Sequence, residues 1–213
     1  MIAVTDPIAL PLRRSPKQTL HHVWAPKLRR TIMFTSADQL HLWVILEAHP
    51  RVTRYCERPS WSAEPDLPFA ADFWVILEGT AVWLVIEAPS FPEQSSEPHA
   101  DTGPTVQRIG IDAINRHRVW IQNWLALLPY LSSTSSLDID SVVASVVDFV
   151  GVGGKRFEDV ERHFSGIDTV VVRSATIAAL HRGSLVSQAL QDRPWDLGTE
   201  IFRCPRSSND AAQ

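Results

Sequence analysis

Residues 72–87 consist of two apolar runs separated by the short link Glu78-Gly79-Thr80, and no other stretch constrains the fold as strongly. β-Branched and aromatic residues on both sides of a glycine-containing link predict a β-hairpin. Asp72 opens the first strand and Glu87 closes the second, so the hairpin is expected to bring the two carboxylates together at its open end. Hard divalent cations prefer oxygen ligands, and the pair is therefore a candidate Mg²⁺ or Mn²⁺ site. An acidic residue beside a buried strand is often only the solvated end of that strand, and this interpretation stays open.

The bulk composition is that of an ordinary globular protein. The 213 residues are 45% apolar and 21% charged, which allows one large domain or two small ones. No apolar run approaches the ~20 residues that a membrane-spanning helix needs, and the first residues lack the features of a signal peptide. Cys56 and Cys204 fit no metal-binding spacing and are expected to be reduced thiols. The composition therefore predicts a cytoplasmic protein without a membrane partner.

The net charge of −4 conceals a basic segment near the N-terminus. Between Pro7 and Ala37 there are six basic residues and no acidic one, namely Arg13, Arg14, Lys17, Lys27, Arg29 and Arg30. Such a segment is suited to lie along a phosphate backbone, because the neutralisation of phosphates releases counterions. A solvated basic tail without a partner is the alternative.

The first half of the chain is predicted to be an α/β domain that covers residues 29–131, preceded by a basic arm over residues 1–28. Ser36 followed by Gln39 forms a capping box, which starts a helix from Asp38 to about His49. Further elements are expected in this order: strands at 29–34, 51–59 and 108–111, a proline-rich loop at 89–104, and a helix from 112 to about 131.

The second half is predicted to be a separate domain over residues 138–206, with a tail at 207–213. A linker at 132–137, which contains the run Ser-Ser-Thr-Ser-Ser, separates it from the first domain. Three short helices are expected at 140–150, 157–164 and 168–181, followed by two strands near 184–188 and 199–203. Three helices followed by a β-hairpin is the order of elements in a winged helix.

Five segments together carry a resemblance to a known family. They are Arg30-Thr-Ile-Met-Phe-Thr-Ser36-Ala-Asp-Gln39, Leu46-Glu-Ala-His-Pro50-Arg-Val52-Thr-Arg-Tyr-Cys-Glu57-Arg-Pro59, Ala71-Asp72-Phe73, Val85-Ile86-Glu87 and Leu180-His-Arg-Gly183-Ser-Leu. In this order they resemble the TnsA family, the endonuclease subunit of heteromeric cut-and-paste transposases, over roughly residues 29–202. The resemblance implies a restriction-endonuclease-like domain, with a central mixed sheet flanked by helices, and a C-terminal winged helix. It also implies three partners: transposon-end DNA, a transposase subunit and an ATPase regulator protein.

The resemblance assigns the catalytic positions to Gln39, Asp72 and Glu87, and the metal to Asp72 and Glu87. Two positions depart from the family's pattern: Gln39 stands where the family has a glutamate, and Pro89 where it has a lysine. An amide adds no charge and accepts no proton, and proline offers no cation to stabilise the phosphate. Loss of one preorganised electrostatic group typically costs ~10²–10³ in rate. The sequence therefore predicts a weak or inactive nuclease centre in a protein that serves assembly and DNA binding.

An arginine is the alternative source of the missing cation, and Arg29, Arg30 and Arg58 are the candidates. An arginine stabilises anionic oxygen but does not give up its proton, so an active variant stays open. The residues predicted to contact DNA are Lys27, Arg29, Arg30, Arg58, Arg173 and Arg182. From Lys155 to Gln213 eight basic residues balance eight acidic ones, which favours a protein partner for the winged helix over tight DNA binding.

A different class of function discards the resemblance. A stand-alone winged-helix DNA-binding regulator with a ligand-sensing front domain would use some of the eight tryptophans to line a pocket. Tryptophans at these spacings are more often core residues, and both interpretations stay open.

Overall fold

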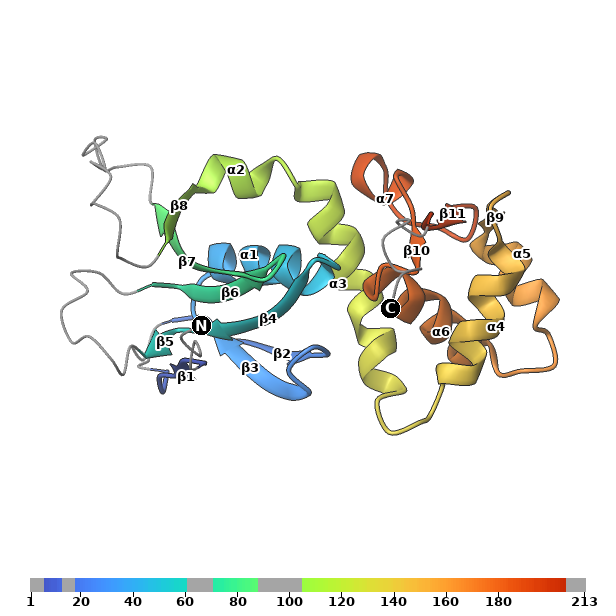
Figure 1. Ribbon diagram of the computed structural model, residues 1–213, viewed down its shortest axis with the longest axis horizontal. Coiled ribbons are helices and arrows are strands. Elements are labelled where there is room, and N and C mark those ends of the chain that lie inside the picture. The colour runs from blue at the N-terminus through green and yellow to red at the C-terminus, as the bar shows by residue number, and fades with distance from the viewer. Residues whose placement is uncertain (1–5, 13–17, 61–70, 88–104, 206–213) are drawn as a thin grey trace. The chain divides into compact units, whose positions relative to one another are not determined.

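The computed structural model describes residues 6–12, 18–60, 71–87 and 105–205. These residues form a mixed α/β protein, as the sequence predicts. The chain divides into two compact units, one made of residues 1–47 and 51–117 and the other of residues 48–50 and 118–213. Figure 1 shows the helices and strands of each unit. Within the described ranges, no helix combines the length and the apolar character that a membrane crossing requires.

A four-stranded mixed sheet in the order β4–β6–β7–β8 forms the centre of the first unit (Figure 1). The antiparallel strands are β4 (Val52–Glu57), β6 (Phe73–Leu77) and β7 (Thr80–Glu87), and β8 (Val106–Gly110) runs parallel to β7. The predicted hairpin is β6–β7, and the two residues of its turn, Glu78 and Gly79, have φ values of 51° and 82°. Two positive φ values match the twist of the flanking strands, and glycine adopts them at least cost.

Helix α1 (Ala37–Ala48) packs on one face of this sheet. The ring of Phe34 joins the two, because its centroid lies 6.0 Å from that of Trp43 on α1 and 5.9 Å from that of Phe73 on β6. All three aromatic side chains are at most 1% exposed. The face of the sheet that carries Phe73 is therefore the α1 face.

The start of α1 is capped as the sequence predicts. Ser36 Oγ accepts hydrogen bonds from the backbone N–H groups of Asp38 (3.1 Å) and Gln39 (3.3 Å). The Gln39 side chain instead donates to the Asp72 carboxylate. Gln39 thus has a tertiary contact that a local capping motif does not predict.

The elements before β3 and after β8 differ from the sequence predictions. β2 (His21–Ala25) pairs with β3 (Arg30–Phe34), so the last part of the predicted extended arm is one strand of an antiparallel ribbon. β1 (Ile8–Ala9) pairs with β5 (Pro59–Ser60). The single helix expected from 112 to 131 is two helices, α2 (Ile111–Asn115) and α3 (Arg118–Ser133). The predicted loop at 89–104 lies outside the described residues.

The second unit contains the three predicted helices, α4 (Asp140–Val150), α5 (Phe157–His163) and α6 (Thr169–His181). A three-stranded antiparallel sheet in the order β10–β11–β9 accompanies them, formed by β9 (Lys155–Arg156), β10 (Leu185–Val186) and β11 (Glu200–Arg203). The sequence did not predict β9 or the short helix α7 (Ala189–Asp192), because elements of two to four residues are too short to show a hydrophobic period. α3 belongs to this unit, whereas the sequence analysis places it in the first domain.

The buried amide of Asn123 links α3 to α7 and to the segment that follows it. Its side chain is nearly inaccessible, with a residue exposure of 5%. Nδ2 donates to the carbonyls of Leu190 and Arg193, both at 2.8 Å, and Oδ1 accepts from the backbone N–H of Trp195 at 2.7 Å. One side chain thereby satisfies three backbone groups that lie 67 to 72 residues further along the chain.

Replacement of Asn123 by alanine is predicted to destabilise the second unit by about 2–4 kcal/mol, because two carbonyls and one N–H lose their partner in a buried site. Urea unfolding measures the loss. Asn115→Ala on the exposed end of α2 is the control, and its effect should stay below ~0.5 kcal/mol. Equal effects of the two variants would contradict the role assigned to Asn123.

Candidate functional site

Asp72 lies at the start of β6 and uses both carboxylate oxygens. Oδ1 accepts from Nε2 of Gln39 at 2.9 Å, and Oδ2 accepts from the backbone N–H of Ile86 at 2.8 Å. The backbone N–H of Asp72 donates to the Leu84 carbonyl at 2.9 Å. The carboxylate therefore extends the hydrogen bonding between β6 and β7 by one residue, and it reaches α1 through Gln39.

Asp72 consequently lies on the α1 face of the sheet. Phe73 pairs with Leu84, so both side chains are on this face, and alternation along β7 places Ile86 there as well. At the end of β7, the α1 face thus carries one carboxylate, one amide and apolar side chains.

The opposite face carries Glu87. Trp83 packs there in a cluster with Cys56 and Trp74. Glu87 is four positions further along β7, so the alternation of side chains places it on the same face as Trp83. Val106 of β8 joins this cluster, so Arg108 lies on the same face, and its Nη1 is 3.2 Å from Oε1 of Glu87.

The sequence predicts that the Asp72 and Glu87 carboxylates converge, whereas they lie on opposite faces of the sheet, one bound to Gln39 and the other to Arg108. The hairpin itself is correct, but its two ends differ. The Asp72 side chain turns to Ile86 N–H and to α1, whereas Glu87 follows the regular alternation of β7 and pairs with Arg108.

The residues on the α1 face do not fit a Mg²⁺ or Mn²⁺ centre. A hard cation needs several oxygen ligands, but the Gln39 amide turns its Nε2 and not its oxygen to Asp72. Glu57, which pairs across the strands with Phe73, is already bound by two arginines. In the part of the chain that the structure describes, no group of three or more His, Cys, Asp or Glu side chains could hold a metal ion.

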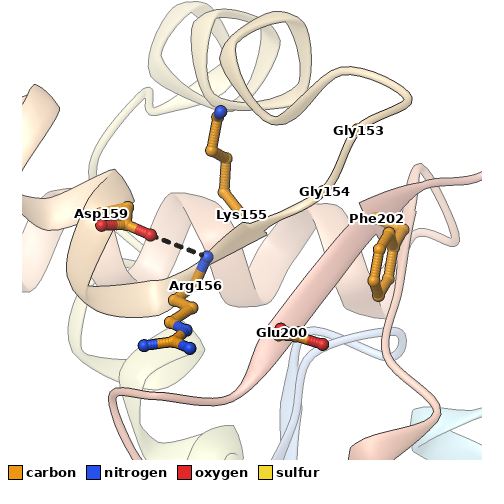
Figure 2. Close-up of a pocket in the computed structure, with 7 residues that line it drawn as sticks. All are labelled: Gly153, Gly154, Lys155, Arg156, Asp159, Glu200 and Phe202. Carbon is orange, nitrogen blue, oxygen red and sulfur yellow. Dashed lines mark hydrogen bonds between the residues drawn. The ribbon is translucent and has the colours of Figure 1, made fainter.

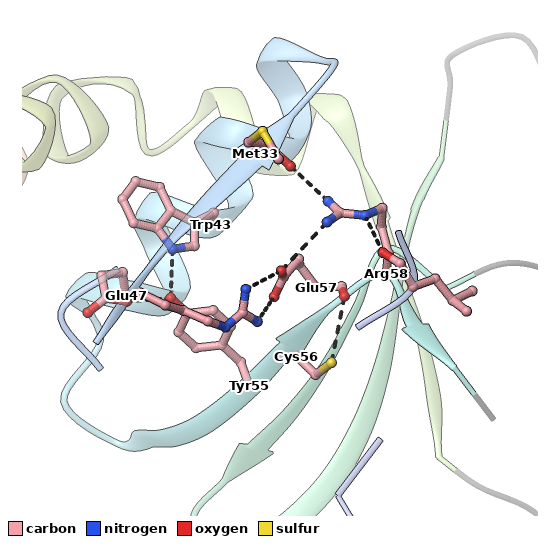
Figure 3. Close-up of polar contacts among 9 residues, drawn as sticks. Met33, Trp43, Glu47, Tyr55, Cys56, Glu57 and Arg58 are labelled. Atoms are coloured by element: carbon pink, nitrogen blue, oxygen red, sulfur yellow. Dashed lines mark hydrogen bonds and ion pairs between the residues drawn. The ribbon is translucent and has the colours of Figure 1, made fainter. Parts of the chain in front are cut away.

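A second polar centre surrounds the buried carboxylate of Glu57, which is 1% exposed (Figure 3). Arg30 donates to both of its oxygens, at 2.7 and 2.6 Å, and this bidentate pair raises the pKa of the Arg30 guanidinium. Arg58 lies 3.6 Å from the same carboxylate and donates to the Met33 carbonyl at 2.7 Å and to the Leu10 carbonyl at 3.2 Å. Burial lowers the pKa of Arg58.

These contacts bear on the arginines proposed to replace the missing lysine. Arg30 and Arg58 hold Glu57 and backbone carbonyls together, so their guanidinium groups serve the fold of the first unit. Arg58 also has a φ of 44°, which a non-glycine residue adopts only when its surroundings compensate. Arg29 is exposed and has a φ of 52° at the start of β3.

A third polar centre, which the sequence analysis did not predict, lies between α1 and β4. Glu47 is fully buried, and its Oε2 accepts from the Tyr55 hydroxyl at 2.5 Å, while that hydroxyl accepts from Nε1 of Trp43 at 2.7 Å (Figure 3). Oε1 of Glu47 accepts from the backbone N–H of Lys27 at 3.0 Å, and Nζ of Lys27 donates to the Leu46 carbonyl at 2.9 Å. A glutamate in a helix that is apolar nearly all round was the available signal for a buried, partnered carboxylate.

Lys27 is half-buried, and its Nζ is held by the Leu46 carbonyl. Burial lowers its pKa from 10.5 to about 8, although the Glu47 carboxylate opposes the shift. Burial raises the pKa of Tyr55 well above its usual value and raises that of Cys56 from 9.0 to about 11. Lys27, Tyr55 and Cys56 thus titrate differently in the folded and the unfolded chain.

In the second unit, the predicted DNA-binding arginines form ion pairs. Nε of Arg173 lies 2.6 Å from Glu161, and its Nη1 donates to the Tyr130 hydroxyl at 2.9 Å. Arg182 pairs with Asp140 at 2.7 Å. Most of α6 is buried, from Ser174 to His181, so this helix is a central core element of its unit.

A scan of the chain against models of protein families and a search among curated proteins find no match.

The pKa shifts around Lys27 predict how stability depends on pH. Between pH 8 and 10.5 the unfolded chain binds more protons at Lys27 than the folded chain does, so this group makes stability rise with pH. Cys56 acts in the opposite sense between pH 9 and 11, and Tyr55 does so above pH 10. Stability should therefore rise from pH 8 to 9, stay level to pH 10 and then fall.

Urea unfolding at these pH values measures the profile. Lys27→Met should remove the rise between pH 8 and 9, whereas Lys155→Met, at an exposed position of the second unit, should leave it unchanged. A rise that persists in Lys27→Met would show that another group causes it.

Proposed function

We propose that this chain is a TnsA-like, non-catalytic subunit of a heteromeric DNA transposition machine, acting in the cytoplasm. In this proposal the first unit is a restriction-endonuclease-like scaffold whose nuclease centre is incomplete, and the second unit is a winged helix. The partners are a transposase subunit and an ATPase regulator protein, and the assembled complex reaches transposon-end DNA.

The contact between Gln39 and Asp72 carries the proposal. The two residues are 33 positions apart in the sequence, and the family resemblance assigns both to one catalytic centre. Their side chains lie 2.9 Å apart. This contact supports the proposal because it brings together two positions that the resemblance assigns to one centre.

The composition of this centre favours the non-catalytic form. The second acidic residue, Glu87, belongs to the other face and pairs with Arg108. The position beside Asp72 on the α1 face is taken by Ile86, which offers no metal ligand. Neither Arg30 nor Arg58 substitutes for the missing lysine, because both guanidinium groups bind Glu57 or backbone carbonyls.

The second unit supports the winged-helix part of the proposal through the order of its elements. α4, β9, α5 and α6 follow one another, and β10 and β11 complete an antiparallel sheet with β9. The alternative function, a stand-alone DNA-binding regulator, needs exposed basic side chains on α6. Arg173 is paired with Glu161 and Tyr130, and this occupation favours a protein partner for the second unit.

The first prediction concerns DNA cleavage. In a reaction with the partner transposase, transposon-end DNA and Mn²⁺, the wild type and Asp72→Ala should give the same low level of cleavage at the 5′ strands. Sequencing-gel analysis of the DNA ends measures it. Cleavage by the wild type that Asp72→Ala abolishes would overturn the non-catalytic assignment.

The second prediction is a gain of metal binding, measured by isothermal titration of Mn²⁺. Gln39→Glu combined with Ile86→Glu should add two carboxylates beside that of Asp72 on the α1 face and bind Mn²⁺ at least tenfold more tightly than the wild type, because added charged oxygen ligands raise the affinity. Gln39→Glu combined with Val85→Glu is the matched control, since residue 85 lies on the opposite face. Equal binding by both double variants would contradict the assignment of the two faces.

The third prediction concerns assembly. When the chain is co-expressed with its two proposed partners, a transposase subunit and an ATPase regulator, the three proteins should purify as one complex on transposon-end DNA, and Asp72→Asn should not disturb it. A chain that stays separate from both proteins and binds DNA alone would instead favour the regulator.

A further inference from the structure

The outer face of the sheet in the second unit carries side chains to which the proposed function assigns no role. Phe202 of β11 pairs with Val186 of β10, and Glu200 of β11 pairs with Arg156 of β9. Alternation places these four side chains on one face. The other face carries Ile201 and Leu185, which are at most 1% exposed and belong to the core.

Apolar side chains are unusually accessible on this outer face. Phe202 is 39% exposed and Val186 is 41% exposed, although they are cross-strand neighbours. Val152, which is 87% exposed, precedes the glycines that border the same region. Adjacent exposed apolar side chains around a polar group are typical of protein-binding surfaces.

The backbone fixes the position of the Phe202 ring. Gly154 has a φ of 71°, and a Cβ atom at this residue would collide with the Phe202 ring, so the ring lies directly on the glycine backbone. A ring that is already ordered loses little conformational freedom when a ligand stacks on it.

The ring forms one wall of a cavity of about 220 Å³ (Figure 2). Its lining residues are Gly153, Gly154, Lys155, Arg156, Asp159, Glu200 and Phe202. Small-molecule sites usually occupy roughly 300–1,000 Å³, so this cavity accommodates a single large side chain rather than a cofactor.

Among the charged residues that line the cavity, Glu200 is the one whose side chain is free to bind a ligand. Asp159 accepts from Arg162 at 3.0 Å and from the backbone N–H of Arg156, and the Arg156 guanidinium lies 3.6 Å from Glu158. Nζ of Lys155 lies over a phenylalanine ring, and Figure 2 shows its side chain extending away from Glu200. Among the described residues, the Glu200 carboxylate has neither a hydrogen-bond nor an ion-pair partner.

We propose that this cavity binds an arginine side chain, flanked by apolar residues, from a partner protein. The guanidinium pairs with the Glu200 carboxylate and stacks on the ring of Phe202, and the apolar flanks cover Val186 and Val152. The inference is independent of the proposed transposition function.

An NMR titration of the full chain tests it, with the peptide acetyl-Leu-Val-Arg-Leu-Val-amide as the probe. Amide shifts should concentrate at Gly153, Gly154, Glu200 and Phe202. Citrulline in place of the arginine keeps the shape and removes the charge, and it should weaken binding about tenfold or more.

Two variants define the site. Glu200→Gln should weaken binding of the arginine peptide about tenfold and make it equal to that of the citrulline peptide. Asp192→Asn, at an exposed acidic position on α7, is the matched control and should not change the affinity. Equal binding by Glu200→Gln and the wild type, the absence of shifts at millimolar peptide, or the same shifts with a DNA duplex would each overturn the proposal.

Discussion

The pairing of β7 with a strand on each side decides where the chemistry of the first unit lies. β6 and β8 fix the register of β7 along most of its length, and a regular strand sends successive side chains to opposite faces. Ile86 therefore belongs to the α1 face and Glu87 to the other face. Asp72 lies just before β6, and its carboxylate is held on the α1 face by Gln39 and by the backbone N–H of Ile86. A shift of β7 by one residue would put Glu87 on the α1 face, where it could share a metal ion with Asp72. In the observed register that position holds Ile86, and Asp72 only forms hydrogen bonds.

Two buried carboxylates organise the rest of the first unit. Glu47 links α1, β4 and the turn before β3, and Glu57 gathers Arg30 and Arg58 around the end of β4. A buried charge is tolerated only when it is paired and hydrogen-bonded, and Arg30 and Arg58, two of the cations predicted to contact DNA, bind the buried carboxylate of Glu57. The same holds in the second unit, where Arg173 binds Glu161.

The sequence predicted well those features that depend on neighbouring residues. The β6–β7 hairpin, the Ser36 cap and the helices α4, α5 and α6 follow from turn chemistry, capping and hydrophobic period. It failed where partners come from far along the chain. α3 shows an ordinary helical pattern, and nothing local reveals that its Asn123 binds backbone groups about 70 residues away.

For the candidate site, the sequence by itself determined the class of fold, the hairpin and the identity of the acidic residues at its two ends. Only the tertiary structure decided that Asp72 meets Gln39 and that Glu87 meets Arg108. The reason is that residue type and order set which groups are present, whereas strand register and the burial of remote charges set which face each group occupies and what it binds.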